Sequence, residues 1–332
     1  MQIDHSNVRD IQLQNPLKDI LILHAFVQEL HGVLESEHPQ INFHYAQDTA
    51  QTKVLLNTIN PQAVFSISHQ DLPAHTLREA GLYPSVKWFH VGGSGIDKML
   101  PWSNGNALMS NGAGVLARFL AETVLGAMLA MNNNLPLYLQ QQSKNSWQQH
   151  EFKPLCEQTI LIVGLGAVGE RVADNAKALG MRVIATRRSA KSYRNVDQLY
   201  GEDQLLEALP LADFVSIHLP LNEQTAGSFG YDVLAVMKQG ACLINTARGG
   251  IVDEDALQVV LKDGLLKAAF FDVFAQEPLP SDSPLWQLEN LMISPHMADG
   301  VHGFERRYLQ FFSENITRWN AAEMLKNIKR FD

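Results

Sequence analysis

Three side chains with complementary chemistry follow apolar runs in the second half of the chain. Arg248 lies between such a run and two glycines, Glu277 precedes a proline, and His296 follows a proline. A guanidinium binds a carboxylate through two parallel hydrogen bonds, and glycines beside it leave space for a ligand. A carboxylate beside an imidazole stabilises the imidazolium form and makes it a better proton donor near neutral pH. Together they suit a reaction that binds a carboxylate substrate and transfers a proton.

Each of these residues also has a simpler explanation. An arginine after a strand is more often a surface residue, a single histidine is usually structural, and Glu-Pro commonly begins a loop. Their shared position favours the catalytic interpretation, because all three follow strands of one predicted sheet. Ligands of open α/β sheets bind beyond the carboxyl ends of the strands.

A glycine-rich turn indicates what this sheet binds. Gly164-Leu-Gly166-Ala-Val-Gly169 lies between an apolar run and a helical pattern, and a second apolar run follows at 182–186. This order of strand, glycine turn, helix and strand is typical of a dinucleotide-binding site. Gly164 allows the tight turn, Gly166 lets the backbone approach a pyrophosphate, and Gly169 lets the helix pack closely. The helix N-terminus would receive the phosphates.

The residues after the second run, Arg187, Arg188 and Ser189, indicate which dinucleotide binds. An NAD site usually has an acidic residue here for the ribose 2′-OH, whereas an arginine accommodates the 2′-phosphate of NADP. Two cations and a hydroxyl suit a phosphate dianion, although a solvated basic loop would have the same composition. We expect NADP(H) to be preferred over NAD(H).

The surrounding elements predict two doubly wound parallel-sheet α/β domains. Predicted strands lie at 19–25, 41–46, 63–68 and 86–91 in the first domain, and at 159–163, 182–186, 213–219, 241–247, 267–274 and 291–294 in the second. A last amphipathic helix, at about 303–319, has no place in the second sheet and is expected to return to the first domain. We therefore expect a smaller, discontinuous flavodoxin-like substrate domain, 1–108 and 301–332, and a Rossmann-type nucleotide-binding domain, 109–300.

The N-terminal segment, a long apolar run and a polar segment predict further features of the structure. Residues 1–18 are polar and are expected to form a frayed extension, and 27–37 a helix. The apolar run Val115–Met131 predicts a buried helix between domains or at a subunit contact. The Gln- and Asn-rich segment 132–153 is expected to form an arm that embraces a second subunit in a homodimer.

A second glycine-rich turn, Gly92-Gly93-Ser94-Gly95, follows a predicted strand of the first domain. Free N–H groups at such a strand end can hold a carboxylate. An ordinary glycine turn explains the same residues equally well.

The composition limits the partners and the location. The chain has 332 residues, enough for two domains, and its net charge of −9 gives no general attraction to nucleic acid. No signal peptide is evident and no run of about 18 apolar residues is present, so no membrane segment is expected. Cys156 and Cys242 lack metal-site spacing, so we expect no metal and a cytoplasmic protein with reduced thiols.

In combination, these motifs resemble the D-isomer-specific 2-hydroxyacid dehydrogenase family. The resemblance runs in order through the 92–97 loop, Ala121-Glu122, the glycine turn, His218-Leu-Pro220-Leu221, Asn245-Thr-Ala-Arg248-Gly249, Asp272-Val-Phe…Glu277-Pro-Leu279 and Ser294-Pro-His296. The order and spacing are more specific than any single motif. The run Ser283-Pro-Leu-Trp286, together with the paired arginines, is most similar to glyoxylate/hydroxypyruvate reductases that use NADPH.

The resemblance implies reduction of a small 2-keto acid to a D-2-hydroxy acid by hydride from a nicotinamide. Arg248 would bind the substrate and stabilise its oxygen, and His296 would donate the proton with the help of Glu277. Backbone N–H groups of Gly93, Ser94 and Gly95 would hold the substrate carboxylate. The implied cofactor-binding residues are Gly164, Gly166, Ala167, Val168, Gly169, Arg187, Arg188, Pro220, Thr246 and Asp272.

The chain departs from the family pattern at two places. Thr123 follows Ala-Glu where members often have a histidine, and Met297-Ala-Asp299-Gly300 replaces a glycine- or tryptophan-containing turn. Asp299 is expected close to the substrate, which leaves the physiological keto acid open. A 3-phosphoglycerate dehydrogenase-like enzyme and a non-enzymatic NAD(P)H-sensing protein of the same fold are the alternatives. Arg187 argues against the first, and the lack of basic or disordered flanks against the second.

Overall fold

The computed structural model describes residues 5–24, 31–67, 71–103, 107–189 and 193–329. The chain forms two compact units, Met1–Val115 with His302–Asp332, and Leu116–Val301. The first boundary falls after Val115 and not at residue 108, because Leu108–Asn111 forms the fifth strand of the first sheet. The return boundary falls between Val301 and His302, against the 300/301 expected.

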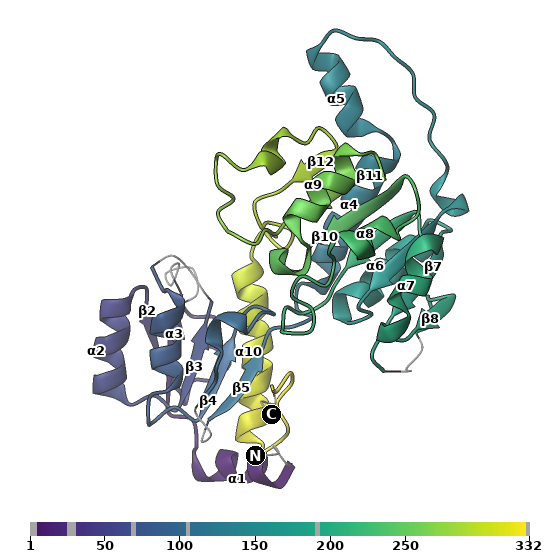
Figure 1. Cartoon of the computed structure of the whole chain (residues 1–332). Helices are drawn as coiled ribbons and strands as arrows, with labels where there is room; N and C mark the ends of the chain where they lie inside the picture. The colour runs from purple at the N-terminus through teal and green to yellow at the C-terminus, as the bar shows by residue number, and fades with distance from the viewer. Residues whose placement is uncertain (1–4, 25–30, 68–70, 104–106, 190–192, 330–332) are drawn as a thin grey trace. The chain divides into compact units, whose positions relative to one another are not determined.

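The first unit is built on five parallel strands in the order β2-β1-β3-β4-β5 (Figure 1). The strands are β1 Asp19–Leu23, β2 Asn42–Ala46, β3 Ala63–Ser66, β4 Trp88–Val91 and β5 Leu108–Asn111. The helices are α1 His5–Gln14, α2 Thr49–Ile59, α3 Ala74–Gly81 and α10 Phe304–Asn320, with a 3₁₀ turn at Asp97–Met99. This strand order is that of flavodoxin-like folds, as predicted.

Helix α10 returns to the first unit because its apolar face completes that unit's core. Phe312 and Trp319 lie one above the other on this face, and their rings lie 4.8 and 5.4 Å from the ring of Trp88 in β4. All three side chains are fully buried. Aromatic contacts of this kind add to the free energy gained by burying apolar area.

The expectation of a frayed N-terminus is wrong for α1. Val8 and Gln12 are buried, and the Gln12 amide donates to the carbonyl of Glu323 at 2.8 Å. The indole of Trp319 donates to the carbonyl of Asn15 at 3.0 Å. These partners lie more than 300 residues away in the sequence, which hides them from local patterns. The helix expected at 27–37 lies partly outside the described residues, and its remainder, 31–37, forms turns.

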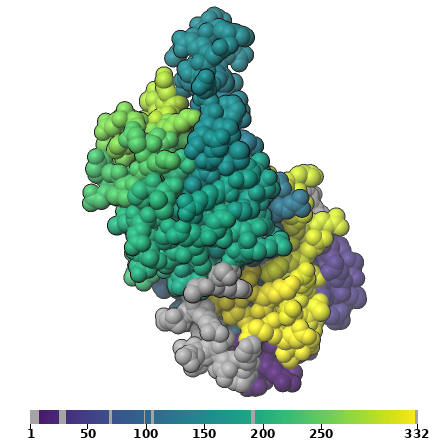
Figure 2. All heavy atoms as spheres, turned by 90° about the vertical axis from the view of Figure 1, so that its right-hand side faces the viewer, coloured from purple at the N-terminus to yellow at the C-terminus, as the bar shows by residue number. Residues whose placement is uncertain are grey.

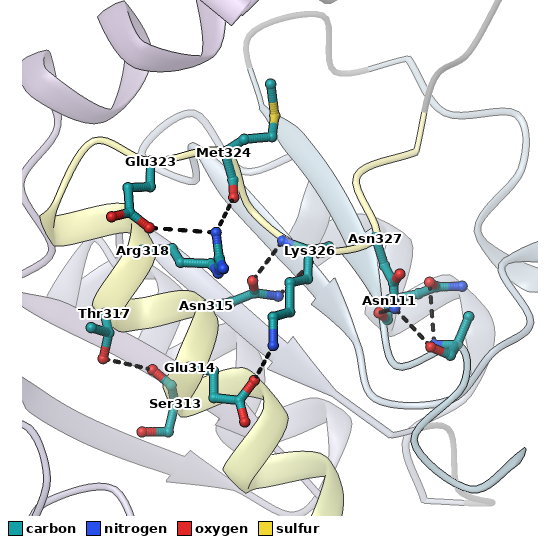
Figure 3. A network of polar contacts seen from close by, with 11 residues as sticks. Asn111, Ser313, Glu314, Asn315, Thr317, Arg318, Glu323, Met324, Lys326 and Asn327 are labelled. Carbon is teal, nitrogen blue, oxygen red and sulfur yellow. Dashed lines mark hydrogen bonds and ion pairs between the residues drawn. The ribbon is translucent and has the colours of Figure 1, made fainter. Parts of the chain in front are cut away.

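The C-terminal segment covers the edge strand β5 (Figure 3). The Asn327 amide donates to the carbonyls of Asn111 and Ala113 at 3.1 and 2.8 Å. Asn315 of α10 accepts the Lys326 N–H at 2.8 Å. The segment that leads out of the first unit is therefore held by the last described residues of the chain.

The second unit is built on seven parallel strands in the order β12-β11-β10-β9-β6-β7-β8. They are β6 Thr159–Val163, β7 Arg182–Thr186, β8 Gln198–Tyr200, β9 Phe214–Ile217, β10 Ala241–Asn245, β11 Leu266–Phe271 and β12 Leu291–Ile293. The six strands that come first in the sequence of this unit, β6 to β11, lie in the Rossmann order, which confirms the predicted fold class. The sequence predicts six strands in this unit, and the structure adds β8, which is three residues long. Its brevity leaves almost no periodicity to detect.

Helices cover both faces of this sheet. They are α4 Ala117–Asn132, α5 Leu135–Ser143, α6 Ala167–Ala178, α7 Leu205–Ala208, α8 Tyr231–Ala235 and α9 Glu254–Lys262, with 3₁₀ turns at Leu155–Glu157, Glu202–Gln204, Leu209–Leu211, Gly249–Ile251 and Pro284–Gln287. Ile160 and Ile162 point into the cluster under α4 and α6, and Leu161 and Val163 into the one under α8 and α9. Because both faces are buried, the strands are apolar throughout.

Helix α5 and the segment that follows it stand out from the rest of their unit (Figures 1 and 2). Among the described residues, no helix is long and apolar enough to cross a membrane.

Candidate active site

The glycine turn joins β6 to α6 as predicted. Gly164 has φ +95°, and a Cβ there would lie 2.8 Å from the His218 carbonyl oxygen. A Cβ on Gly169 would lie 2.5 Å from the carbonyl oxygen of Gly164, so only glycine allows this close packing. Gly166 has no described atom within 4 Å of its ideal Cβ position. Its backbone therefore borders open space.

The first turn of α6 offers hydrogen-bond donors to this space. Gly166 is the N-cap and provides no side-chain cap. The N–H groups of Ala167 and Val168 belong to the first helical turn, where no intrahelical acceptor exists. With the positive end of the helix dipole, they suit the pyrophosphate of a dinucleotide.

Thr246, directly after β10, also fits a bound ligand. Its Oγ1 atom is buried and has no hydrogen-bond partner among the described residues. A buried hydroxyl without a partner carries a desolvation cost that a ligand atom would remove. Pro220 and Asp272 likewise follow strands β9 and β11. Because all these strands are parallel, the expected cofactor residues lie along one edge of the sheet.

The two arginines after β7 contact carboxylates. Arg187 Nη1 lies 3.3 Å from Glu170 Oε1 of α6, and Arg188 Nε lies 3.5 Å from Glu202 Oε2. The Arg187 side chain is 21% exposed and that of Arg188 is 75% exposed. The sequence shows no acidic residue beside Arg187, but the fold brings Glu170 to it. A bound phosphate would share these cations with the two carboxylates.

Asn245, the last residue of β10, builds the turn that carries Arg248. Its buried amide donates to the carbonyl of Arg248 and accepts the N–H of Ala247, both at 3.1 Å. The Arg248 guanidinium donates to the Ala247 carbonyl at 2.7 Å. A Cβ on Gly249 would lie 1.9 Å from the carbonyl carbon of Phe274, so glycine lets the loop after β11 pack against this turn.

Glu277 and His296 form the pair that the sequence predicts. Glu277 Oε2 lies 2.7 Å from His296 Nδ1, while its Oε1 accepts the Phe274 N–H at 3.0 Å. His296 has a left-handed backbone with φ 53°, an uncommon conformation that clusters at functional sites. The contact through Nδ1 orients the imidazole and leaves Nε2 for another partner.

Asp272 fixes the loop that carries His296. Its carboxylate is 1% exposed and accepts the Ser294 hydroxyl at 2.5 Å and the Met297 and Ala298 N–H groups at 2.8 and 2.9 Å. Its carbonyl accepts the His296 N–H at 2.8 Å. We expected Asp272 at the cofactor; within the described chain its carboxylate holds this loop.

Thr123 and Asp299, the two departures from the family pattern, belong to the same site. Thr123 Oγ1 donates to the carbonyl oxygen of the residue before Asp299 at 2.9 Å. Removal from water raises the pKa of the Asp299 carboxyl above its usual value, and the charge of Asp272 raises it further. The charges of His296 and Arg248 lower it.

His218, in contrast, is suited to a structural role. Its Nε2 lies 2.9 Å from the Ser216 hydroxyl. Burial lowers the pKa of His218 to about 4, so this imidazole is neutral near pH 7.

The Gly93–Gly95 loop belongs to the first unit. The Asn111 amide donates to the carbonyl of Ser94 at 2.5 Å, and the Gly112 N–H donates to the carbonyl of Gly93 at 3.0 Å. The last residue of β5 and the residue after it therefore hold the loop by its carbonyl groups. In a trans peptide the N–H points opposite to the carbonyl, so the Gly95 N–H points away from Asn111.

Sequence reasoning missed the supporting residues Asn111, Asn245 and Glu170. The two asparagines share a detectable signal, because each ends an apolar strand just before a turn. Asparagine side chains often bond to backbone groups there. Glu170 gives no such signal, since its contact depends on how α6 packs beside β7.

A sheet with a dinucleotide-binding turn and a Glu–His pair along one edge is the architecture of a nicotinamide-dependent dehydrogenase. Residues 125–298 match the family model described as D-isomer specific 2-hydroxyacid dehydrogenase, NAD binding domain. The chain belongs to this family of oxidoreductases, as its sequence motifs predicted.

Individual relatives agree with this assignment. A glyoxylate reductase of Korarchaeum cryptofilum is 30% identical over 302 residues, 88% of this chain and 90% of the relative. A D-3-phosphoglycerate dehydrogenase of Methanocaldococcus jannaschii is 33% identical over 215 residues, 63% of this chain but only 40% of the relative. A solved D-isomer specific 2-hydroxyacid dehydrogenase family protein from Aeromonas salmonicida has a TM-score of 0.84 at 28% identity, covering 95% of this chain and 100% of that one.

Proposed function

We propose that this protein reduces a small 2-keto acid, such as glyoxylate or hydroxypyruvate, to the D-2-hydroxy acid with NADPH. The observation that carries the proposal is the 2.7 Å contact between Glu277 and His296, at the strand edge that also carries Arg248. Membership of the family supports the reaction class. The glyoxylate reductase relative supports the substrate class.

Each residue has a separate task in the proposed reaction. Bound nicotinamide would supply the hydride that reaches the keto carbon. Arg248 binds the substrate carboxylate and stabilises the negative charge that develops on the keto oxygen. His296 donates its Nε2 proton to that oxygen, and Glu277 holds the ring through Nδ1. The N–H groups of Gly93–Gly95 are further donors for a substrate carboxylate.

We infer that NADP(H) is preferred over NAD(H). Arg187 and Arg188 stand where the second strand of a Rossmann domain ends, the position that faces the ribose 2′ group. Arg187 is already oriented by Glu170, which lowers the entropy lost on binding a phosphate. The two guanidinium groups can form charge-assisted hydrogen bonds with a 2′-phosphate.

We also infer a homodimer in which the arm, residues 132–153, contacts a second copy. The arm exposes Leu139 at 66% and Trp147 at 92%, and its residues line an open pocket of about 760 Å³. Apolar side chains exposed together in this way mark a binding surface. A second copy of the chain brings the same arm and is the simplest partner.

Oxidation of 3-phosphoglycerate is the second candidate, favoured by the Methanocaldococcus relative. The experiment that tests both is steady-state kinetics with NADPH and with NADH against glyoxylate, hydroxypyruvate, pyruvate and 3-phosphohydroxypyruvate. Turnover with NADPH and an unphosphorylated keto acid is expected. Protein that binds NADPH but oxidises it with none of the four would instead be an NAD(P)H-sensing protein.

A further inference from the structure

Asp299 lies in a rigid turn immediately beyond the Glu277–His296 pair. The two peptide groups before it are fixed, because their N–H groups donate to Asp272 and the Ala298 carbonyl accepts from Thr123. The Val301 N–H donates to the Asp299 carbonyl at 2.7 Å. The backbone thus presents the Asp299 side chain from a set position.

The surroundings of this carboxyl differ from those of Asp272. Asp272 receives three hydrogen bonds from the loop that carries His296. Asp299 is half-buried, and within the described chain its own backbone N–H is the donor that stabilises its charge. A carboxylate that loses water and gains no donor from another residue destabilises the fold. A structural role does not account for it.

Asp299 follows His296 in the turn that Asp272 holds, and this places it beside the predicted proton donor. The groups that act on its carboxyl are Asp272, His296 and Arg248. Asp272 is committed to the loop, whereas His296 and Arg248 are the two groups that the proposed function assigns to the keto oxygen and the carboxylate. The remaining part of a 2-keto acid is the substituent on its keto carbon.

We propose that Asp299 is a specificity-determining residue that faces this substituent, favouring keto acids that carry a hydroxyl there and rejecting those that carry a second anion. This inference rests on the proposed function. A hydroxyl can donate a charge-assisted hydrogen bond to the carboxylate. A carboxylate or phosphate is repelled by it in a half-buried site. The same charge disfavours a phosphorylated substrate.

The test compares the parent, Asp299→Asn and Asp299→Ala with pyruvate, hydroxypyruvate and oxaloacetate, whose substituents are methyl, hydroxymethyl and carboxymethyl. We expect Asp299→Asn to raise the kcat/KM ratio of oxaloacetate to pyruvate by about tenfold or more, since one repulsive charge is removed. Asp299→Ala should lower the ratio of hydroxypyruvate to pyruvate. Asp263→Asn, the same change at an exposed helix end, is the matched control and should leave both ratios unchanged.

A binding measurement tests the role of Asp299 independently of catalytic turnover. Calorimetry in the presence of NADP would compare oxamate, with one negative charge, and tartronate, with two. Asp299→Asn should bind tartronate more tightly and oxamate equally. Unchanged kinetic ratios and unchanged tartronate affinity in a folded variant would overturn the role of Asp299 while leaving the reductase intact. A parent without turnover would refute the proposed function, and the analogue affinities would still decide on Asp299.

Discussion

At the scale of single residues, Glu277 acts on His296 through both geometry and charge. Replacing Glu277 with glutamine keeps an acceptor for Nδ1–H but removes the negative charge that lies 2.7 Å from the ring nitrogen. We expect kcat/KM for the keto acid to fall by about 10²- to 10⁴-fold, the usual contribution of general acid catalysis. Glu289→Gln, an exposed glutamate that pairs with Lys144, is the control. Near-parental rates in Glu277→Gln would show that its charge is dispensable.

The preference for NADPH also depends on single side chains. Arg187→Asp should weaken NADPH binding by about tenfold or more, because charge-assisted hydrogen bonds to the 2′-phosphate are replaced by repulsion. NADH binding should change little. Fluorescence titration with each dinucleotide measures both affinities. Arg182→Asp makes the same charge change at the other end of β7 and should affect neither. Equal loss of NADPH and NADH in Arg187→Asp would contradict the 2′-phosphate assignment.

At the scale of elements, the strand ends explain why the site residues lie where they do. Strands β10 and β11 end at Asn245 and Phe271, earlier than the apolar runs do. Arg248 and Asp272 therefore lie in loops whose shape depends on hydrogen bonds between them and their neighbours. Apolar periodicity does not reveal these bonds.

The Gly93–Gly95 loop gives a test of positioning. Asn111 is buried, and its amide fixes the carbonyl of Ser94. Asn111→Asp keeps the shape but replaces the donor with an acceptor that repels this carbonyl. We expect KM for the keto acid to rise by about tenfold with a smaller change in kcat, because ground-state binding is lost. The exposed Asn42→Ala serves as control. An unchanged KM would mean that the loop does not hold the substrate carboxylate.

Much of the architecture follows from sequence because apolar strands, the glycine turn and the C-terminal helix are local signals. Strand β8 is too short to detect, and α1 is ordered by contacts with the far end of the chain. The Glu277–His296 pair could be predicted because both residues follow strands of the same predicted sheet. The roles of Asp272 and Asn111 could not, since they depend on exact loop geometry.

At the scale of the whole molecule, the arm predicts the oligomeric state. Leu139→Glu combined with Trp147→Glu places charge on its exposed apolar surface. Sedimentation should show a dimer for the parent and a monomer for this variant, since burying unpaired charge opposes association. Leu206→Glu, at an exposed leucine outside the arm, should remain dimeric. A dimeric double variant would place the interface elsewhere.

Because α10 completes the core of the first unit, folding of the N-terminal part of the chain depends on its C-terminal helix. A premature stop between residues 303 and 311 would remove Phe312 and Trp319, the partners of Trp88 in the N-terminal unit. The damage would appear at the opposite end of the chain from the lesion. The unit Leu116–Val301, which lies entirely before the stop, would keep its strands and its glycine turn. Such a truncated product would resemble a nucleotide-binding protein fused to an unfolded N-terminal tail.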